Sequence, residues 1–381
     1  MKRLMLMGAS GSVGSQVVDV IKQHLDQLEL VGVSVGENVG YLKDLLNTFN
    51  IKYAYTINKN EDLINSYPNV KFFYGDDGLE KMAKLDDYDL FVNALLGFLG
   101  FKPTLAAINN HKDVALANKE TLVAGGAIIN KAVEENKVNL YPIDSEHIAI
   151  LQCMRGHKRK DIKRLILTGS GGAFRDYSRD KLKDATLQKA LKHPVWNMGA
   201  KITVDSATMM NKGFEVIEAH YLFDIPYENI DVILHPQSIV HSMVEYNDGS
   251  IIAQMGTPDM HMMIKYALLY PSHLNDNNTN YLDLDTLSSL NFKKMDYNRY
   301  PLVKLAKNVG QYEGNFGAIL IGANDEAVNL FLKDRIHFLD IEGLIFETLR
   351  NATFIKDPSA DDIVASHKWA KEYVDTLWAN G

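Results

Sequence analysis

The chain has 381 residues, 46% of them hydrophobic, so it is long enough for two or three domains that each bury a core. Its 48 acidic residues outnumber its 40 basic ones, and the formal charge of −8 argues against nucleic acid as the main partner. Cys153 is the only cysteine, so no intramolecular disulfide can form, and no apolar run approaches the ~20 residues that cross a bilayer. We therefore expect a cytoplasmic protein that binds neither nucleic acid nor a membrane.

The first part of the chain has the pattern of repeated βαβ units. Short runs rich in leucine and β-branched residues alternate with amphipathic stretches, and the apolar residues of segment 12–24 recur at helical spacing. This alternation is typical of a parallel sheet covered by helices. We predict an α/β protein with a Rossmann-like N-terminal domain over residues 1–143. Its expected strands are 3–7, 28–35, 53–57, 89–94, 113–117 and 139–143.

The pattern changes after residue 143 and indicates a central α+β domain over residues 144–270. Its expected strands are 162–168, 231–235, 240–246 and 250–255, the last two joined by an Asn-Asp-Gly hairpin turn. The Asn-rich stretch 275–280 predicts a linker over residues 271–300. A C-terminal helical bundle is expected over residues 301–381, with helices at 302–310, 315–333, 341–351 and 361–377.

A glycine-rich loop follows the first predicted strand. Gly8, Gly11 and Gly14 allow a tight turn, let a pyrophosphate approach the backbone and open a helix N-terminus toward it. The spacing is G-x-x-G-x-x-G rather than the usual G-x-G-x-x-G, but the strand before it and the helix after it favour a dinucleotide site over a plain turn.

The end of the second predicted strand bears on the choice of dinucleotide. Glu37 favours NAD, because an acidic residue there binds the ribose hydroxyls. The alternative is that Glu37 points to solvent and that Ser34, Asn38 or a more distant lysine meets a 2′-phosphate.

Carboxylates in two segments suggest a cation site. Asp144 and Glu146 follow a predicted strand, and residues two apart in an extended chain project to the same side, where both can bind one hard cation. Mg²⁺ and Mn²⁺ prefer such oxygen ligands. A lone D-x-E string is more often a solvated loop, but Glu215 offers a third ligand. Glu218, one turn later, is a further ligand or a carboxylate behind the site.

Donor groups in the same region suit a phosphate. Ser206, Asn211 and Lys212 supply a hydroxyl, an amide and an ammonium around a turn into a helix. Ser170 lies in a glycine-rich turn that either wraps an anion or has no ligand. Segment 193–199 is bounded by proline and glycine and is interpreted either as a lid or as a buried loop anchor.

Two other features are interpreted as structural. His235 and His241 flank a Pro-Gln-Ser turn, and oxygen ligands already account for a hard cation, so a second metal site is disfavoured. Cys153 has no base and orienting pair beside it in the sequence, so we expect a small buried hydrophobe and not a nucleophile.

Taken together and in this order, the motifs resemble the 1-deoxy-D-xylulose 5-phosphate reductoisomerase family. The resemblance runs from residue 8 to residue 259, and the run Asn211-Lys212-Gly213 with Glu215 is its most specific part. The matching segments are 8–14, 117–120, 144–146, 169–172, 193–194 with Trp196, 201–218, 235–238 and 254–259.

The resemblance implies a metal-dependent oxidoreductase and isomerase. Such an enzyme rearranges 1-deoxy-D-xylulose 5-phosphate by a retro-aldol/aldol route and reduces the product with NADPH to 2-C-methyl-D-erythritol 4-phosphate, the first committed step of the non-mevalonate isoprenoid pathway. It also implies one Mg²⁺ or Mn²⁺ and a homodimer. Two alternatives are a semialdehyde-type dehydrogenase, which needs Cys153 for covalent catalysis, and a non-catalytic dinucleotide sensor.

The resemblance also assigns roles to single residues. Lys119 is expected to stabilise negative charge on the substrate beside the metal, and Trp196 to cover the substrate. The implied metal ligands are Asp144, Glu146 and Glu215. The implied substrate contacts are Lys119, Ser145, Glu146, Ser170, His193, Trp196, Ser206, Asn211, Lys212 and Glu215. The implied cofactor contacts are Gly8, Ser10, Gly11, Ser12, Val13, Gly36, Glu37, Asn38, Asn118, Glu120 and Gly199.

Overall fold

The computed structural model describes residues 1–381 except 197, 276–278 and 381. Three of these, 276–278, belong to the Asn-rich stretch predicted as a linker, so that part of the prediction lies outside the described residues. Contacts divide the chain into two compact units. The first comprises Met1–Thr121, Ile129–Asp144 and Met260–Thr279, and the second Leu122–Ile128, Ser145–Asp259 and Asn280–Gly381.

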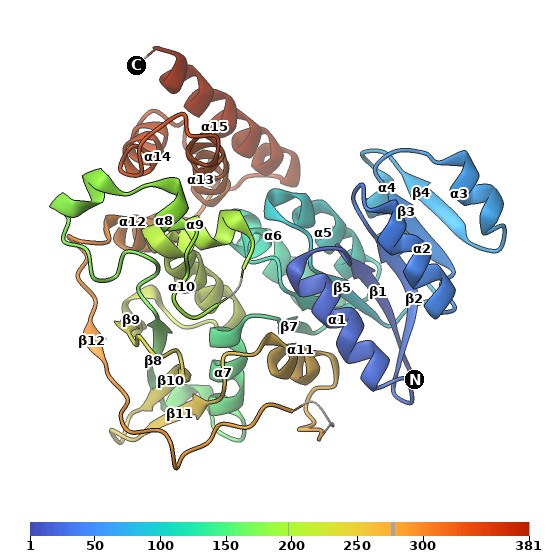
Figure 1. The fold of residues 1–381 in the computed structure, drawn as a ribbon, viewed down its shortest axis with the longest axis horizontal. Helices are drawn as coiled ribbons and strands as arrows, with labels where there is room; N and C mark the ends of the chain where they lie inside the picture. The colour runs from blue at the N-terminus through green and yellow to red at the C-terminus, as the bar shows by residue number, and fades with distance from the viewer. Residues whose placement is uncertain (197, 276–278, 381) are drawn as a thin grey trace. The chain divides into compact units, whose positions relative to one another are not determined.

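The first unit is built on a seven-stranded sheet in which every neighbouring pair is parallel (Figure 1). The strand order is β4-β3-β2-β1-β5-β6-β7, so the order reverses between β1 and β5. The predicted strands are present, but the sequence analysis missed β4, a four-residue edge strand without a buried residue. The strands are β1 Lys2–Met7, β2 Leu28–Ser34, β3 Tyr53–Thr56, β4 Lys71–Tyr74, β5 Leu90–Asn93, β6 Asp113–Leu116 and β7 Leu140–Pro142.

Helices bury their apolar faces on this sheet. In α1, Val17, Val20 and Ile21 are buried, as the helical spacing predicts, whereas Leu25, which that spacing places on the same face, is 55% exposed just after the helix. Helix α11 contacts α1 although it lies far along the chain, and its pattern was not recognised in the sequence. The helices are α1 Ser12–Gln23, α2 Val39–Thr48, α3 Glu61–Ser66, α4 Gly78–Ala83, α5 Phe101–Asn109, α6 Glu120–Asn136, shared with the second unit, and α11 Met260–Leu268.

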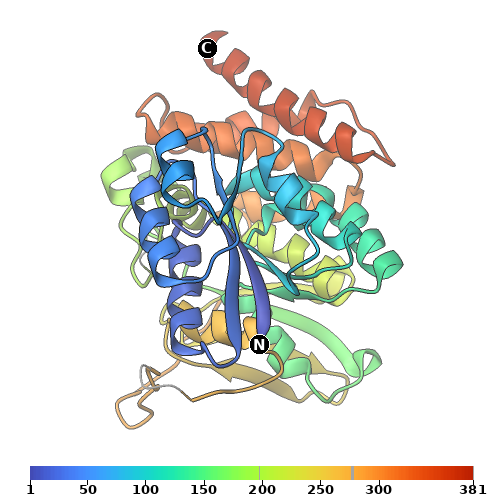
Figure 2. The same ribbon diagram turned by 90° about the vertical axis from the view of Figure 1, so that its right-hand side faces the viewer.

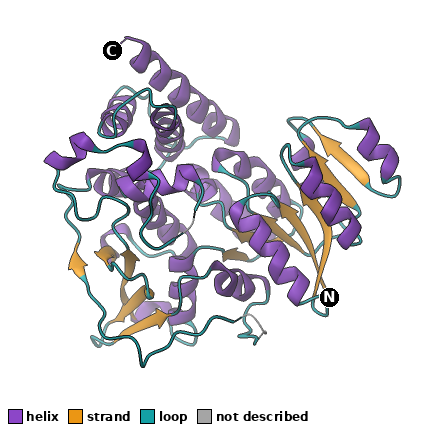
Figure 3. Ribbon diagram, viewed as in Figure 1, coloured by secondary structure: helices purple, strands orange, loops and turns teal. Residues whose placement is uncertain are grey.

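The second unit contains a mixed five-stranded sheet of order β11-β10-β8-β9-β12 (Figure 3). Strands β8 and β9 are parallel, and the other neighbours are antiparallel. The predicted strands are confirmed, but β12 was not predicted. The strands are β8 Ile162–Gly169, β9 Ile230–Leu234, β10 Val240–Tyr246, β11 Ile251–Met255 and β12 Lys293–Lys294.

Helices supply the rest of the second unit. Helix α13 is buried along most of its length and contacts α9, α12, α14 and α15. Figure 2 shows the red helix α15 lying along the orange helices that precede it. The helices are α7 Ser145–Met154, α8 Leu187–Ala190, α9 Ala200–Thr208, α10 Met210–Phe223, α12 Pro301–Tyr312, α13 Phe316–Leu332, α14 Asp340–Arg350 and α15 Ala360–Asn380. None of the described helices is long and apolar enough to cross a membrane.

The glycine loop lies at the reversal of strand order. Gly8 has a φ of +87°, and a Cβ there would lie 2.4 Å from the carbonyl oxygen of Ala94, just after β5. A Cβ on Gly14 would lie 2.1 Å from the oxygen of Gly8. These two glycines therefore let α1 approach the ends of β1 and β5 at the place where doubly wound sheets bind ligands.

We expect Gly14→Ala to lower the stability of the first unit by about 2 kcal/mol, because the new methyl group would overlap backbone atoms that cannot move aside. The measurement is the midpoint of thermal or urea unfolding. Gly40→Ala in α2 is the matched control, since its Cβ would meet only the Asn38 side chain at 3.8 Å. Equal midpoints for Gly14→Ala and Gly40→Ala would contradict the packing argument.

Candidate active site

The glycine loop leaves the N-terminus of α1 available to an anion. Gly11 precedes α1, no described side chain caps the helix, and its first turn has no acidic residue. Gly8 donates its N–H to Ser34 Oγ over 2.8 Å, which ties the loop to the end of β2. Because a helix N-terminus presents unsatisfied N–H groups and partial positive charge, this loop suits a pyrophosphate. Ser34 is buried in that contact.

The other predicted cofactor residues of the first unit lie around this loop or near the ends of neighbouring strands. Glu37 and Asn38 are exposed after β2, and Asn38 Oδ1 accepts the N–H of Tyr41 at 3.1 Å, capping α2. Gly199 lies in the second unit, where it precedes α9 with open space around its Cβ position. The others are Ser10, Ser12 and Val13 in the loop and first turn of α1, Gly36 after β2, and Glu120 at the start of α6.

Asn118 shapes the loop that follows β5. Its Nδ2 donates to the oxygens of Leu95 at 2.9 Å and Gly97 at 2.7 Å, and its Oδ1 accepts from the backbone and hydroxyl of Thr121. The amide therefore uses its two donors and both lone pairs within the protein. Asn118 therefore holds this loop in place.

Lys119 and Asp144 form an ion pair in the first unit. The Lys119 Nζ lies 2.7 Å from Asp144 Oδ2, and the two side chains are only 8% and 12% exposed. A lysine held this way presents a fixed positive charge beside the Asp144 carboxylate.

The sequence argument for Asp144 and Glu146 was wrong about the local structure. Strand β7 ends at Pro142, and α7 begins at Ser145, so Glu146 lies in the first turn of a helix and not in extended chain. Ser145 Oγ donates to the Glu146 carboxylate. The start of the helix, and not the alternation of a strand, aims this carboxylate.

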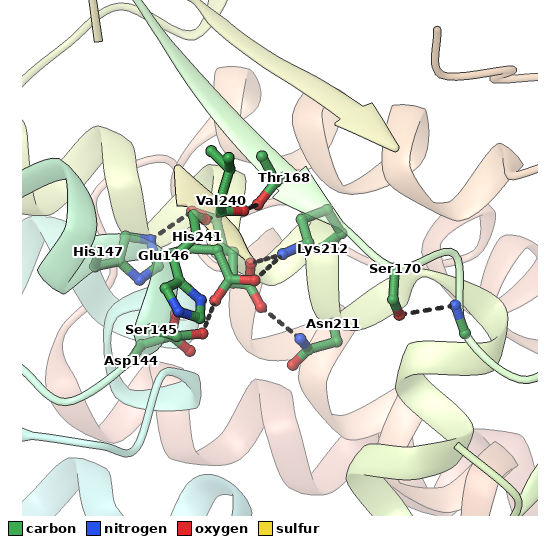
Figure 4. A network of polar contacts seen from close by, with 12 residues as sticks. Asp144, Ser145, Glu146, His147, Thr168, Ser170, Asn211, Lys212, Val240 and His241 are labelled. Carbon is green, nitrogen blue, oxygen red and sulfur yellow. Dashed lines mark hydrogen bonds and ion pairs between the residues drawn. The ribbon is translucent and has the colours of Figure 1, made fainter. Parts of the chain in front are cut away.

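Lys212 joins the carboxylates of two helices in the second unit. Its Nζ lies 2.7 Å from Glu146 Oε1 on α7 and also donates to Glu215 Oε2 on α10 (Figure 4). Asn211 Nδ2 donates to the other oxygen of Glu215. Lys212 and Glu215 are 5% and 1% exposed. Burial alone would lower the pKa of Lys212, but Glu146 and Glu215 outweigh it and hold that pKa above its ordinary value.

Asp144, bonded directly to Ser145, completes a group of three carboxylates. One oxygen each of Asp144, Glu146 and Glu215 lies within 4.8 Å of the others. Clustered carboxylate oxygens repel one another unless cations hold them, and three such oxygens match the preference of Mg²⁺ or Mn²⁺. The three residues that the sequence analysis named as metal ligands are thus brought together.

A buried histidine lies behind this group, and the sequence analysis did not assign it a role. His147 Nδ1 is 3.3 Å from Glu218 Oε2, and its Nε2 is 3.0 Å from the backbone oxygen of Glu215. Both side chains are at most 1% exposed. Glu218 pairs with His147, and the two residues also form a second group of possible ligand atoms with Asp144.

The glycine turn after β8 contacts the other predicted phosphate residues. Gly172 has a φ of +67°, and a Cβ there would lie 2.4 Å from the backbone oxygen of Ser206. A Cβ on Gly169 would lie 3.1 Å from Lys212 Cε. Glycine at positions 169 and 172 lets this turn, which carries Ser170, pack closely against Ser206 and Lys212.

His193 is held as a neutral imidazole next to this turn. Its Nδ1 accepts the N–H groups of Val195 at 3.2 Å and Trp196 at 2.8 Å, so its proton lies on Nε2. That nitrogen is 3.1 Å from Ser170 Oγ, which also accepts the N–H of Gly172 (Figure 4). Burial, with the charge of Arg175, lowers the pKa of His193 to about 4. Ser170 keeps its own proton to donate.

The aromatic part of segment 193–199 lies near a second buried histidine. The ring centroids of Trp196 and His241 are 6.3 Å apart, and burial lowers the pKa of His241 to about 4. Residue 197 of this segment is outside the described residues.

Cys153 and His235 lie as expected for structural residues, whereas His241 Nε2 is buried without a hydrogen-bond partner among the described residues. His235 Nδ1 is 2.9 Å from the oxygen of Asn291, and its Nε2 accepts N–H groups of Ile239 and Val240, so both nitrogens hold backbone. Cys153 is buried, and burial raises the pKa of its thiol to about 11. A thiol in this state is a poor nucleophile at neutral pH.

Comparison with known proteins agrees with this geometry along the whole chain. Residues 4–126 match the family model for 1-deoxy-D-xylulose 5-phosphate reductoisomerase, and residues 140–223 and 255–373 match two C-terminal domain models of the same enzyme. The reductoisomerase of Geobacillus sp. strain WCH70 is 46% identical over 99% of this chain and 100% of its own length. That of Exiguobacterium sibiricum is 45% identical over 99% of both chains. The chain belongs to the 1-deoxy-D-xylulose 5-phosphate reductoisomerase family.

Solved structures of this reductoisomerase share the fold. The enzyme from Zymomonas mobilis in complex with NADPH is 38% identical, with a TM-score of 0.92 over 99% of both chains. A reductoisomerase in complex with NADPH, fosmidomycin and magnesium is 34% identical, with a TM-score of 0.93 over 100% of this chain and 98% of that one.

We expect segment 193–199 to loosen as the pH falls. Because the pKa of folded His193 lies below the ordinary 6.5, the opened segment binds more protons than the closed one between these values. Neutral His193 stabilises the closed segment fully above pH 6.5, and this stabilisation is lost as the pH falls through about 4. Hydrogen exchange of this segment, corrected for the intrinsic rate, measures it.

His193→Asn is the control for that experiment, since its side-chain oxygen can accept the same two N–H groups without titrating. Its exchange should depend less on pH than that of the parent. The same pH dependence in both proteins would show that another group controls the segment.

Proposed function

We propose that this chain converts 1-deoxy-D-xylulose 5-phosphate to 2-C-methyl-D-erythritol 4-phosphate, using NADPH and one Mg²⁺ or Mn²⁺. The observation that carries the proposal is the group of Asp144, Glu146 and Glu215 beside Lys212 and the glycine turn of Ser170. A dinucleotide sensor needs no such group. A homodimer in the cytoplasm is part of the same proposal, by similarity to the family.

The residues present fit a divalent cation. Asp144, Glu146 and Glu215 would hold it, since their oxygens converge and are mostly buried. When bound, the cation acts as a Lewis acid toward neighbouring substrate oxygens in both the rearrangement and the reduction. His147 supports this group by contacting the backbone oxygen of Glu215 and so fixing the first half of α10.

The residues present also fit NADPH. The uncapped end of α1 and the space kept by Gly8, Gly11 and Gly14 would hold its pyrophosphate, and NADPH supplies the hydride of the second step. Asn38 offers its NH₂ group to the ribose end, whereas the nearby Glu37 carboxylate opposes a 2′-phosphate.

The chain's own residues account for substrate binding and charge stabilisation. Lys119, fixed by Asp144, stabilises negative charge that develops on a substrate oxygen near the carboxylates. Ser170 and Ser206 donate hydroxyl protons to the phosphate. Asn211 and Lys212 follow Ser206 and already contact Glu215, so they connect phosphate binding with the cation ligands.

Segment 193–199 closes the site in this proposal. His193 donates from Nε2 toward Ser170, at the edge of the phosphate position, and its Nδ1 orders the backbone up to Trp196. The indole of Trp196 then covers the substrate and excludes water. A semialdehyde-type mechanism is disfavoured because burial keeps Cys153 a thiol.

The direct test mixes the protein with 1-deoxy-D-xylulose 5-phosphate, Mn²⁺ and NADPH and follows nicotinamide absorbance. We expect turnover in the parent and a loss of at least ~100-fold in Glu215→Gln, with weaker Mn²⁺ binding by calorimetry, because a buried ligand charge is removed. Glu228→Gln, an exposed site on the second unit, is the control. Absence of NADPH oxidation by the parent would overturn the function, and unchanged Mn²⁺ affinity in Glu215→Gln would overturn the metal assignment.

The position of Glu37 yields a separate prediction about the cofactor. Glu37→Gln should lower the KM for NADPH about two- to fivefold and leave that for NADH unchanged, because an exposed like charge near a 2′-phosphate costs only a fraction of a kcal/mol. Kinetics with both reductants at two salt concentrations measure this. An equal effect on NADH would place Glu37 away from the 2′-phosphate.

A further inference from the structure

Helix α9 connects two parts of the proposed substrate site. It begins after Gly199, the last residue of the covering segment 193–199, and contains Ser206 in its last turn. Any movement of α9 therefore shifts the end of that segment and the Ser206 hydroxyl together. What holds α9 in place decides how well both are aligned.

A buried polar contact fixes α9 to the C-terminal helix α13. Asn324 Nδ2 donates to Asp205 Oδ1 over 2.8 Å, and Lys201 Nζ lies 2.7 Å from Asp205 Oδ2. Asn324 is 0% and Asp205 3% exposed. Asp205 is the residue directly before Ser206, so its two carboxylate oxygens determine where that turn of the helix lies.

The contact continues to α15. Lys201 Nζ is 3.1 Å from Asp325 Oδ1, and His367 Nε2 on α15 is 3.5 Å from Asp325 Oδ2. Burial would raise the pKa of Asp325, but Lys201 and His367 outweigh it and lower that pKa, so the carboxylate stays charged. Lys201 also lies 5.4 Å from the centroid of the Phe214 ring on α10.

We propose that Lys201, Asp205, Asn324 and Asp325, here called the α9 anchor, are positioning residues for the substrate's phosphate. They touch no reacting atom. They act through Ser206 at one end of α9 and Gly199 at the other, so the C-terminal helices determine the affinity of the site for its phosphorylated substrate. The inference rests on the proposed function, because it takes Ser206 as a phosphate donor.

A polar contact between two helices restricts their relative orientation more than apolar packing does. Apolar side chains would hold α9 against α13 with equal or greater stability, but they would tolerate small rotations of the helix. A hydrogen bond from Asn324 to one oxygen of Asp205 fixes the rotation of the helix within a narrow range of angles. This is what the placement of a single hydroxyl requires.

The first experiment compares Asn324→Leu with Asn329→Leu in the full chain. Both remove an amide of similar size from α13, but Asn329 donates to Glu326 of the same helix, 2.6 Å away. For Asn324→Leu we expect the KM for 1-deoxy-D-xylulose 5-phosphate to rise about tenfold and kcat to change less than about threefold, since an unpaired buried carboxylate oxygen displaces α9. Asn329→Leu should retain the parent's KM.

The second experiment exchanges the two partners. Asp205→Asn combined with Asn324→Asp keeps an amide facing a carboxylate, and Lys201 keeps Asp325 as an ion-pair partner. The double variant should recover most of the KM lost in Asn324→Leu, and hydrogen exchange over residues 198–206, fast in Asn324→Leu, should return toward the parent's rate. Recovery of KM and of exchange together is not expected if the pair only contributes to overall stability.

The outcomes separate the two proposals. An unchanged KM in Asn324→Leu, or equal effects in the two leucine variants, would overturn the positioning role while the parent's turnover keeps the proposed function. A kcat that falls with KM unchanged would overturn it as well. If the parent itself does not turn over, the proposed function fails, but faster exchange over residues 198–206 in Asn324→Leu still tests whether the anchor holds α9.

Discussion

The buried ammonium of Lys212 is the interaction on which the site depends. Two carboxylates from different helices, Glu146 on α7 and Glu215 on α10, converge on it in a region that excludes most water. Neither carboxylate is stable there without a positive partner, because an unpaired buried charge costs several kcal/mol. The spacing of α7 and α10 is therefore set by charge as well as by packing, and Lys212 holds Glu146 and Glu215 close together.

The same residue ties the cation ligands to the glycine turn. Lys212 lies beside Gly169, and the junction before it passes through Met209, a buried residue with a φ of +62°. A left-handed conformation is costly for a residue with a side chain and persists where the surroundings fix it. Here Met209 separates α9, which carries Ser206, from α10, which carries Asn211.

Local patterns predicted most of the fold and the chemical types at the site, and long-range contacts account for the rest. The strands around the glycine loop and the turn of Ser170 follow from periodicity and glycine placement, which are properties of a few neighbouring residues. Strand β4 has no buried residue to create a pattern, and α11 packs on α1 from a distant part of the chain. Asp144 and Glu146 were paired on the assumption of extended chain, whereas a helix begins at Ser145 and places Glu146 in its first turn.

The α9 anchor is an example of a long-range contact that could not be predicted from the sequence. Asp205 and Asn324 are separated by 119 residues, and neither has a spacing that marks it as functional. Asparagine has a lower helix propensity than leucine. At a fully buried position its polar side chain also needs a hydrogen-bond partner. The partner here is the carboxylate next to Ser206. A purely stabilising contact would be served by leucine, whereas alignment of a hydroxyl with a phosphate requires a directional bond.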